Sequence, residues 1–323
     1  MKRALVIGSE GNIGKPLCAH LKTKGYEVLA SDIRSGSRSG FIMADITNPA
    51  DLIPAFEWGP DLVFLLGAMV SRVTCEQASS LAVNTNLLGV QNVLDLTKKY
   101  NAKLVYFSTS EVYGPEMGVM AESAVPKPNN RYGLTKLLSE SLVKYEVDTY
   151  GLKAAILRPF MIYDENEDFG DHRSAMIRFA YNLALGKPIS VHKGSMRGWM
   201  HISDALSSIE ASCKVEGFEI INIGNPELHE MSYLAELIRH EFDAPKDLIR
   251  INELPERMTL CKNPDLTKQK EILGVIPEVS LERGVKMVCK KVLQRFSFDK
   301  MFSDNLLLKE EVNLKSEEKV KRN

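Results

Sequence analysis

The fold of this chain is decided by the stretch Ala4-Leu5-Val6-Ile7-Gly8-Ser9-Glu10-Gly11-Asn12-Ile13-Gly14. It begins with a continuous apolar run ended by glycine, as in a strand buried on both faces of a parallel sheet. The glycines permit a tight turn and a close approach of the backbone to a diphosphate. Apolar residues at helical spacing follow between Lys15 and Lys24, and the free N–H groups at the start of such a helix attract negative charge. The stretch therefore predicts a strand, a phosphate-binding turn and a helix.

A second strand and an acidic residue follow at the interval expected for a dinucleotide-binding unit. The strand, Glu27 to Ala30, leads to Asp32, roughly 20 residues after the glycines. A carboxylate there accepts hydrogen bonds from the adenosine ribose hydroxyls and repels a 2′-phosphate, which favours NAD over NADP. Arg34 argues for NADP, because a guanidinium can accept that phosphate. We predict NAD as the cofactor.

Two further strand ends are expected to reach the same ligand. Asp45 and Ile46 follow a third short strand, and Asp61 to Ala68 reads as a fourth buried strand that ends in small residues. The residues that we predict to contact the cofactor from these turns are Gly8, Gly11, Asn12, Ile13, Gly14, Asp32, Ile33, Arg34, Asp45, Ile46, Leu66, Gly67 and Ala68.

Composition argues against several other classes of function. The chain has 323 residues and a net charge of −1, which gives no electrostatic reason to bind nucleic acid or an anionic membrane. Its five cysteines are isolated and its histidines lack metal-ligand spacing, so neither a disulfide framework nor a metal site is predicted. No apolar stretch approaches the roughly 18 residues of a membrane span, and we expect a cytoplasmic protein.

The fifth predicted strand carries residues that suggest chemistry. Lys103 to Phe107 leads into Ser108-Thr109-Ser110-Glu111-Val112-Tyr113-Gly114, and Arg131 to Lys136 opens a long helix further on. Because residues four apart share one face of a helix, Tyr132 and Lys136 are expected to project together above the end of the strand.

Together these segments resemble the extended branch of the short-chain dehydrogenase/reductase superfamily, the nucleotide-sugar epimerases and dehydratases. That family carries GxxGxxG, NxxGTxNxL, S[ST]xxVYG, YxxxK and LRPxNxYG in this order. The chain matches these motifs in turn with the glycine turn, Asn86 to Leu94, Ser108 to Gly114, Tyr132 to Lys136, and Leu157 to Tyr163.

The resemblance covers about residues 1–295 and implies an α/β fold, a Rossmann doubly wound parallel sheet with a smaller, mostly C-terminal α/β substrate lobe. The sheet domain is expected over 1–160, with segments returning at about 198–225, and the substrate lobe over 161–197 and 226–295. The charged residues 296–323 read as a tail that is either an amphipathic helix or disordered.

Two departures from the family pattern lie between these parts. Met161 stands where many relatives place an asparagine, and Asp164-Glu165 replaces their glycine-proline. The acidic run over 164–174 reads as a solvated loop or, alternatively, as a lid over the sugar.

The resemblance also implies roles for the site residues. Tyr132 would take a proton from a sugar hydroxyl while the sugar carbon passes a hydride to NAD, with Thr109 binding the same oxygen. Lys136 would stabilise the phenolate and hold the nicotinamide ribose. Asn86, Tyr132, Lys136 and Pro159 join the predicted cofactor contacts. The predicted substrate contacts are Met69, Ser71, Met161 and Arg197, of which the arginine would grip the diphosphate.

Ser110 and Glu111 discriminate among the reactions of the family and are predicted to be catalytic. Thr109-Ser110-Glu111 resembles UDP-glucuronate decarboxylases and GDP-mannose 4,6-dehydratases. A glutamate there can remove the proton beside a 4-keto group or help to expel a leaving group, because oxidation acidifies the neighbouring C–H. In the alternative interpretation, Glu111 only caps or pairs structurally.

We therefore predict an NAD-dependent enzyme that oxidises C4 of a nucleotide-diphosphate sugar and continues by dehydration, decarboxylation or epimerisation. Two alternatives stay open: a 4-dehydrogenase that stops at the 4-keto product while NADH is recycled separately, and a non-catalytic NAD-binding sensor or scaffold. The helices predicted over Asn86 to Lys99 and Arg131 to Tyr150 resemble those that form a dimer interface in this family, so a homodimer is expected.

Overall fold

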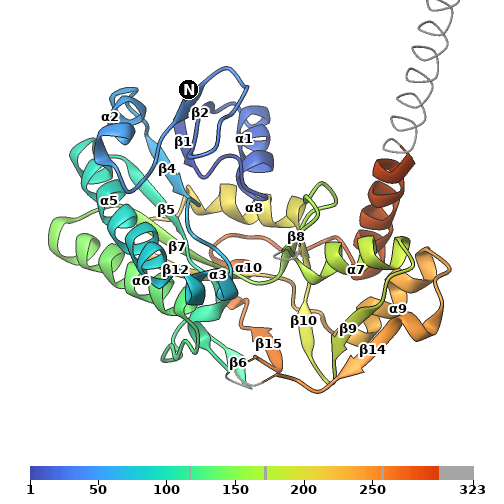
Figure 1. The fold of residues 1–323 in the computed structure, drawn as a ribbon. Coiled ribbons are helices and arrows are strands. Elements are labelled where there is room, and N and C mark those ends of the chain that lie inside the picture. Colours follow the sequence, from blue (N-terminus) through green and yellow to red (C-terminus); the bar gives the residue numbers. More distant parts are fainter. Residues whose placement is uncertain (116–117, 171–172, 256–257, 298–323) are drawn as a thin grey trace, which may run out of the picture.

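The computed structural model describes residues 1–115, 118–170, 173–255 and 258–297. Its central layer is a seven-stranded parallel sheet in the order β12-β7-β5-β4-β1-β2-β3 (Figure 1). These strands are β1 (Arg3–Ile7), β2 (Glu27–Asp32), β3 (Phe41–Met43), β4 (Leu62–Leu65), β5 (Lys103–Phe107), β7 (Ala154–Pro159) and β12 (Glu219–Ile223). The order changes direction between β1 and β4, which places a crevice at their carboxyl ends. The doubly wound sheet confirms the predicted α/β fold class.

Helices cover both faces of this sheet (Figure 1). On one face lie α1 (Gly14–Thr23) and α8 (Ile202–Ser212), and on the other lie α2 (Pro49–Glu57), α5 (Gly89–Lys99) and α6 (Arg131–Tyr150). Because side chains alternate along a strand, Leu5 of β1 packs in the same core as Leu52, while Val6 packs with Leu17. No helix within the described ranges is both long and apolar enough to cross a membrane.

The segment between β4 and α5 is less regular than predicted. It contains α3 (Arg72–Gln77), α4 (Ser79–Val83) and a π turn, η1 (Asn84–Leu88). The helix predicted from Asn86 therefore begins inside a π turn and becomes α-helical only at Gly89. Such turns are rare, and they frequently occur at functional sites.

A smaller lobe surrounds its own hydrophobic core, which includes Tyr163, Phe179 and Trp199. Its strands form a four-stranded sheet, β13-β10-β15-β6, and two pairs, β11-β8 and β14-β9. The strands are β6 (Val119–Met120), β8 (Ile162–Tyr163), β9 (Ile189–His192), β10 (Met196–Gly198), β11 (Met200–His201), β13 (Leu228–Glu230), β14 (Ile249–Asn252) and β15 (Cys261–Pro264). The remaining helical segments are η2 (Ser110–Tyr113), α7 (Ala175–Ala184), α9 (Met231–Glu241), η3 (Lys246–Leu248), α10 (Thr267–Glu271) and residues 281–297.

The last described helix, residues 281–297, packs against the core of the smaller lobe. Phe296 contacts Tyr181 edge-on, with 5.4 Å between the ring centroids. The predicted charged tail lies outside the described residues from position 298 onward.

The turn after β1 admits no side chain at Gly8 or Gly14. Gly8 has a φ of +90°, and a Cβ there would lie 2.5 Å from the backbone nitrogen of Gly67. A Cβ at Gly14 would lie 2.1 Å from the carbonyl oxygen of Gly8. Because these neighbours are backbone atoms, they cannot rotate away as a side chain would. The turn is therefore closed against the end of β4.

Gly14→Ala is expected to destabilise the protein by about 1–3 kcal/mol, because the turn must open to admit the methyl group. Gly118→Ala is the matched control, since a Cβ at Gly118 meets no heavy atom within 4 Å. Urea unfolding followed by circular dichroism measures both variants. A Gly14→Ala protein as stable as wild type contradicts the steric constraint.

Candidate active site

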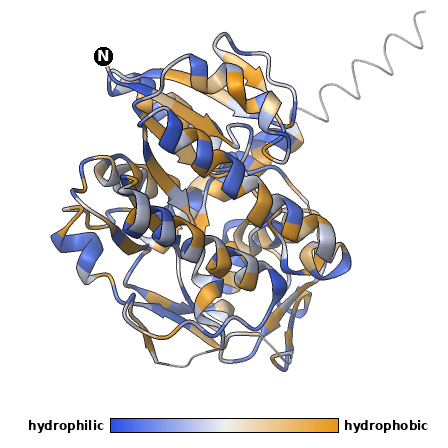
Figure 2. Cartoon of the chain, turned by 90° about the vertical axis from the view of Figure 1, so that its left-hand side faces the viewer, coloured by the Kyte–Doolittle hydropathy of each residue, from blue (hydrophilic) through white to orange (hydrophobic). Residues whose placement is uncertain are grey.

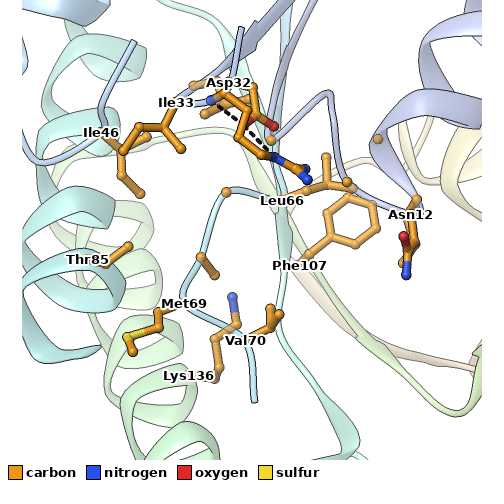
Figure 3. A pocket seen from close by; sticks show the side chains of 18 of the residues that line it. Asn12, Asp32, Ile33, Ile46, Leu66, Met69, Val70, Thr85, Phe107 and Lys136 are labelled. Carbon is orange, nitrogen blue, oxygen red and sulfur yellow. Dashed lines mark hydrogen bonds and ion pairs between the residues drawn. The ribbon is translucent and has the colours of Figure 1, made fainter. Parts of the chain in front are cut away.

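A cavity of about 650 Å³ opens at the carboxyl ends of β1, β2, β4, β5 and β7. Every residue predicted to contact the cofactor lines it except Asn86, and so does Met69 of the predicted substrate contacts. Figure 3 shows Asp32 and Lys136 at opposite ends of the cavity, with Leu66 and Phe107 between them. Ligands of doubly wound sheets bind at this place, and the glycine turn leaves space for the pyrophosphate of NAD.

Asp32 is held in a fixed position at the end of the cavity where we predict the adenosine to lie. Its carboxylate accepts hydrogen bonds from the backbone N–H groups of Glu10 at 2.8 Å and Arg34 at 2.9 Å. The Nε of Arg34 lies 3.4 Å from the same carboxylate. The carboxylate therefore engages the guanidinium that would otherwise bind a 2′-phosphate, and this arrangement favours NAD over NADP.

Tyr132 and Lys136 lie together at the other end of the cavity, on the first turns of α6. The Nζ of Lys136 lies 4.4 Å from the centre of the Tyr106 ring, and burial lowers the pKa of this lysine to about 7. Burial raises the pKa of Tyr132, and its hydrogen bond with Thr109 acts in the opposite direction. The fold thus brings together the three residues predicted to perform the hydride chemistry.

Asn86 lies behind the cavity wall. Its Oδ1 accepts a hydrogen bond from the backbone N–H of Met69 at 2.8 Å, and its Nδ2 donates to the Met69 carbonyl at 3.0 Å. The same Nδ2 donates to the hydroxyl of Thr135 at 3.0 Å. Asn86 therefore holds the segment after β4 against α6, and it reaches the cavity through Met69.

A buried ion pair links α6 to strand β7 of the sheet. Arg158 of β7 donates to the carboxylate of Glu140 from Nη2 at 2.6 Å and from Nε at 2.9 Å. Ser108 donates to the same carboxylate. At the start of the helix, Asn130 accepts from the N–H of Gly133 at 2.9 Å and caps it. The position of the first turns of α6, which carry Tyr132 and Lys136, is thus fixed from both sides.

Glu111 lies just after β5, among cationic groups. Its carboxylate contacts the Nζ of Lys262, accepts from Nδ2 of Asn130 at 2.8 Å and lies 3.6 Å from Nε of Arg72. Lys262 also donates to the hydroxyl of Ser110 at 3.3 Å. Burial opposes ionisation of Glu111, but the charges of Lys262 and Arg72 outweigh it and lower the pKa to about 2. Glu111 is therefore an ionised carboxylate at neutral pH.

Lys262 is absent from the predicted site residues, although it is central to this cluster. It comes from β15 of the smaller lobe, and its side chain is buried. The local signal is its place directly before Asn263-Pro264-Asp265, a stretch typical of the closing segment of the family. Its partner Glu111 lies 151 residues earlier in the chain, so the contact follows from the fold and not from local spacing.

The other predicted substrate contacts do not line the cavity. Ser71 has a φ of 94°, and its hydroxyl caps α3 by accepting a backbone hydrogen bond at 3.2 Å. Met161 packs against the core of the smaller lobe. Arg197 is buried, and its guanidinium donates to three backbone carbonyl groups. Its charge also acts on Glu111, so Arg197 belongs to the same charged cluster.

Comparison with known proteins gives consistent results along the chain. A sequence model of the NAD dependent epimerase/dehydratase family matches residues 4–224. The UDP-N-acetyl-alpha-D-glucosaminuronate decarboxylase of Bacillus cytotoxicus is 28% identical over 316 residues, which cover 88% of this chain and 96% of the relative.

Two solved structures share the fold. The UDP-glucose 4-epimerase of Thermotoga maritima, solved with UDP-glucose, has a TM-score of 0.85 at 24% identity and covers 91% of this chain and 99% of its own. The UDP-glucuronic acid 4-epimerase of Bacillus cereus, in complex with UDP-glucuronic acid and NAD, has a TM-score of 0.78 at 25% identity. The match covers 90% of this chain and 99% of the epimerase.

The ionised state of Glu111 predicts a pH-dependent contribution to stability. Because its folded pKa of about 2 lies below the ordinary 4.5, its contacts stabilise the fold fully above that ordinary value and lose this effect as the pH falls toward 2. A shift of this size corresponds to about 3 kcal/mol. Urea unfolding should show that Glu111→Gln is less stable than wild type by a margin that is largest near pH 6.5 and much smaller near pH 3.

Glu253→Gln is the control, because the Glu253 side chain is 88% exposed. Its stability should follow that of wild type at both pH values. If the margin for Glu111→Gln is the same at both, Glu111 does not have the lowered pKa.

Proposed function

Since this chain belongs to the NAD-dependent epimerase/dehydratase family, we propose that it oxidises C4 of a nucleotide-linked uronic acid and then decarboxylates the 4-keto intermediate. It is an NAD-dependent enzyme of the short-chain dehydrogenase/reductase superfamily, and the relatives described above are named as nucleotide-sugar decarboxylases and epimerases. The observation that carries the proposal is the Glu111 carboxylate, ionised and surrounded by cations beside the Thr109 and Tyr132 pair.

The first step uses the residues at the Lys136 end of the cavity. Tyr132 accepts the proton of the C4 hydroxyl, and the Thr109 hydroxyl holds the same oxygen. Bound NAD supplies the hydride acceptor and a positive charge. With the Lys136 ammonium, this charge offsets the burial that disfavours the Tyr132 phenolate.

The second step follows from the chemistry of the oxidised sugar. A uronic acid with a ketone at C4 is a β-keto acid, so the C5–C6 bond can break with its electron pair passing into the enolate as CO₂ leaves. A proton must then return to C5. We assign this role to the Lys262 ammonium, which contacts Glu111 and Ser110 and whose pKa is lowered by burial. Tyr132 returns its proton to the C4 oxygen as the hydride comes back to C4.

Two properties of the cluster favour decarboxylation over dehydration. Dehydration needs a base that removes the C5 proton, and Glu111 is a weak base because Lys262 and Arg72 stabilise its carboxylate. The cluster also sets three cations, Arg72, Lys262 and Arg197, against this one carboxylate, so it is complementary to an anionic substrate. The relative from Bacillus cytotoxicus is named for a decarboxylation of this kind.

Mass spectrometry of the nucleotide sugars tests this function. Incubation with UDP-glucuronate or UDP-N-acetylglucosaminuronate should give products that have lost CO₂. Tyr132→Phe should keep its NAD but form product at least about 100-fold more slowly, because the proton acceptor is gone. Lys262→Met should still oxidise C4 and accumulate a 4-keto species with NADH, whereas the surface variant Lys246→Met should behave as wild type.

Other outcomes identify the other reactions and contradict the proposal. Loss of water from a neutral hexose in a panel of UDP-, GDP- and dTDP-sugars indicates a dehydratase. A stable 4-keto product with stoichiometric NADH in the wild type indicates a 4-dehydrogenase. Retained NAD binding with no turnover of any member of the panel indicates a sensor or scaffold.

We also propose that the protein forms a homodimer through the face of α6. Leu134, Leu138 and Tyr145 lie on one side of this helix and are 43%, 42% and 57% exposed. Leu88 of the neighbouring π turn is 50% exposed. This side of the molecule faces the viewer in Figure 2, where hydrophobic residues lie among hydrophilic ones along the helices. Pairing with a second copy would bury these side chains.

Light scattering at micromolar concentration should give the mass of a dimer for the wild type and of a monomer for the double variant Leu134→Glu/Leu138→Glu. Ile251→Glu, which changes an exposed apolar residue of the smaller lobe, should leave the dimer intact. A monomeric wild type would exclude this interface.

A further inference from the structure

The acidic segment after β8, residues 164–174, is hydrogen-bonded to the glycine turn. The carboxylate of Glu167 accepts hydrogen bonds from Nδ2 of Asn12 at 3.1 Å and from the backbone N–H and hydroxyl of Ser174 at 3.1 and 2.7 Å. Arg295 of the last described helix donates to the carbonyl groups of Asn166 and Glu167 at 2.8 Å. Since Glu167 is only 6% exposed, the expectation of a solvated loop is wrong at this residue.

Arg173 places a guanidinium in the wall of the cofactor cavity, beside the glycine turn. Its Nη1 donates to Oδ1 of Asn12 at 2.9 Å. The amide of Asn12 is thus held at both ends, through Nδ2 by Glu167 and through Oδ1 by Arg173. The carboxylate of Asp168, which is 68% exposed, lies 3.9 Å from Nη2 of Arg173, a long and solvent-screened ion pair.

We propose that Arg173 binds the pyrophosphate of NAD. The helix α1 has 10 residues and begins without a side-chain cap at Ile13, so its first N–H groups remain for a ligand at the turn. A helix start contributes only about half a positive charge. A guanidinium beside it adds a full charge and a planar fork of donors that matches phosphate oxygens.

Arg173 belongs to a different part of the chain from the other charged residues that line the cofactor cavity. The turn, Asp32 and Lys136 all come from the doubly wound sheet and its helices, whereas Arg173 directly precedes Ser174, the cap of α7 in the smaller lobe. Glu167 and Arg295 hold the segment that carries it. The smaller lobe thus contributes a charge to the cofactor, and Glu167 is a positioning residue for that contact.

Calorimetric titration of the full chain, freed of copurified nucleotide, tests the proposal without any sugar. Arg173→Gln should raise the dissociation constants of NAD and of ADP about tenfold, because both carry the pyrophosphate. The affinity for adenosine, which has no phosphate, should be unchanged. Arg173→Lys keeps the positive charge but loses the planar pair of N–H donors. Its dissociation constants for NAD and ADP should therefore lie between those of wild type and of Arg173→Gln.

Arg250→Gln is the matched control, since Arg250 is exposed on β14 of the smaller lobe. It should bind all three ligands as wild type does. The proposal is overturned if Arg173→Gln binds NAD and ADP like wild type. It is equally overturned if the affinity for adenosine falls in parallel, because Arg173 would then act only by shaping the turn. The proposed sugar chemistry can fail while this contact stands, since NAD binding is measured directly.

Discussion

Lack of space at the carboxyl ends of β1 and β4 sets the geometry of the cofactor site. The backbone of Gly67 fills the volume that a side chain at Gly8 would need, and the Gly8 carbonyl does the same at Gly14, so the turn lies directly against the end of the sheet. The same turn carries the Glu10 N–H that holds Asp32, and it starts the helix α1, whose first N–H groups are the predicted phosphate site. The predicted phosphate site and the position of Asp32 therefore depend on one steric constraint.

Two carboxylates of the site each form an ion pair with a buried cation. Glu140 and Arg158 neutralise each other beneath α6, and Glu111 and Lys262 do so between the two lobes. Burying such pairs costs desolvation energy that their mutual attraction must offset, and each pair also fixes the position of the elements that carry it. Lys136 differs, since burial lowers its pKa to about 7 although its Nζ lies over the Tyr106 ring.

Features that depend on local spacing could be predicted from the sequence. The glycine turn follows its strand directly, and Tyr132 with Lys136 shares a helix face because the residues are four apart. Lys262 and Arg173 could not be found in this way. Lys262 lies beside Glu111 because β15 pairs with β10 and β6. Arg173 lies beside the glycine turn because hydrogen bonds of Glu167 hold the segment 164–174 in place. Their positions depend on tertiary contacts between segments far apart in the chain.

The π turn over Asn84–Leu88 makes the length of this segment as important as its composition. A regular helix advances about 100° per residue, so removing one residue would rotate α4 by that angle relative to α5. Asn86 would then turn away from Met69, and the loop after β4 would lose its attachment to α6. Substitutions at the exposed Leu88 leave this register intact, whereas a single-residue deletion would disrupt it. The register of Asn86 therefore constrains the number of residues in this segment separately from the identity of its exposed side chains.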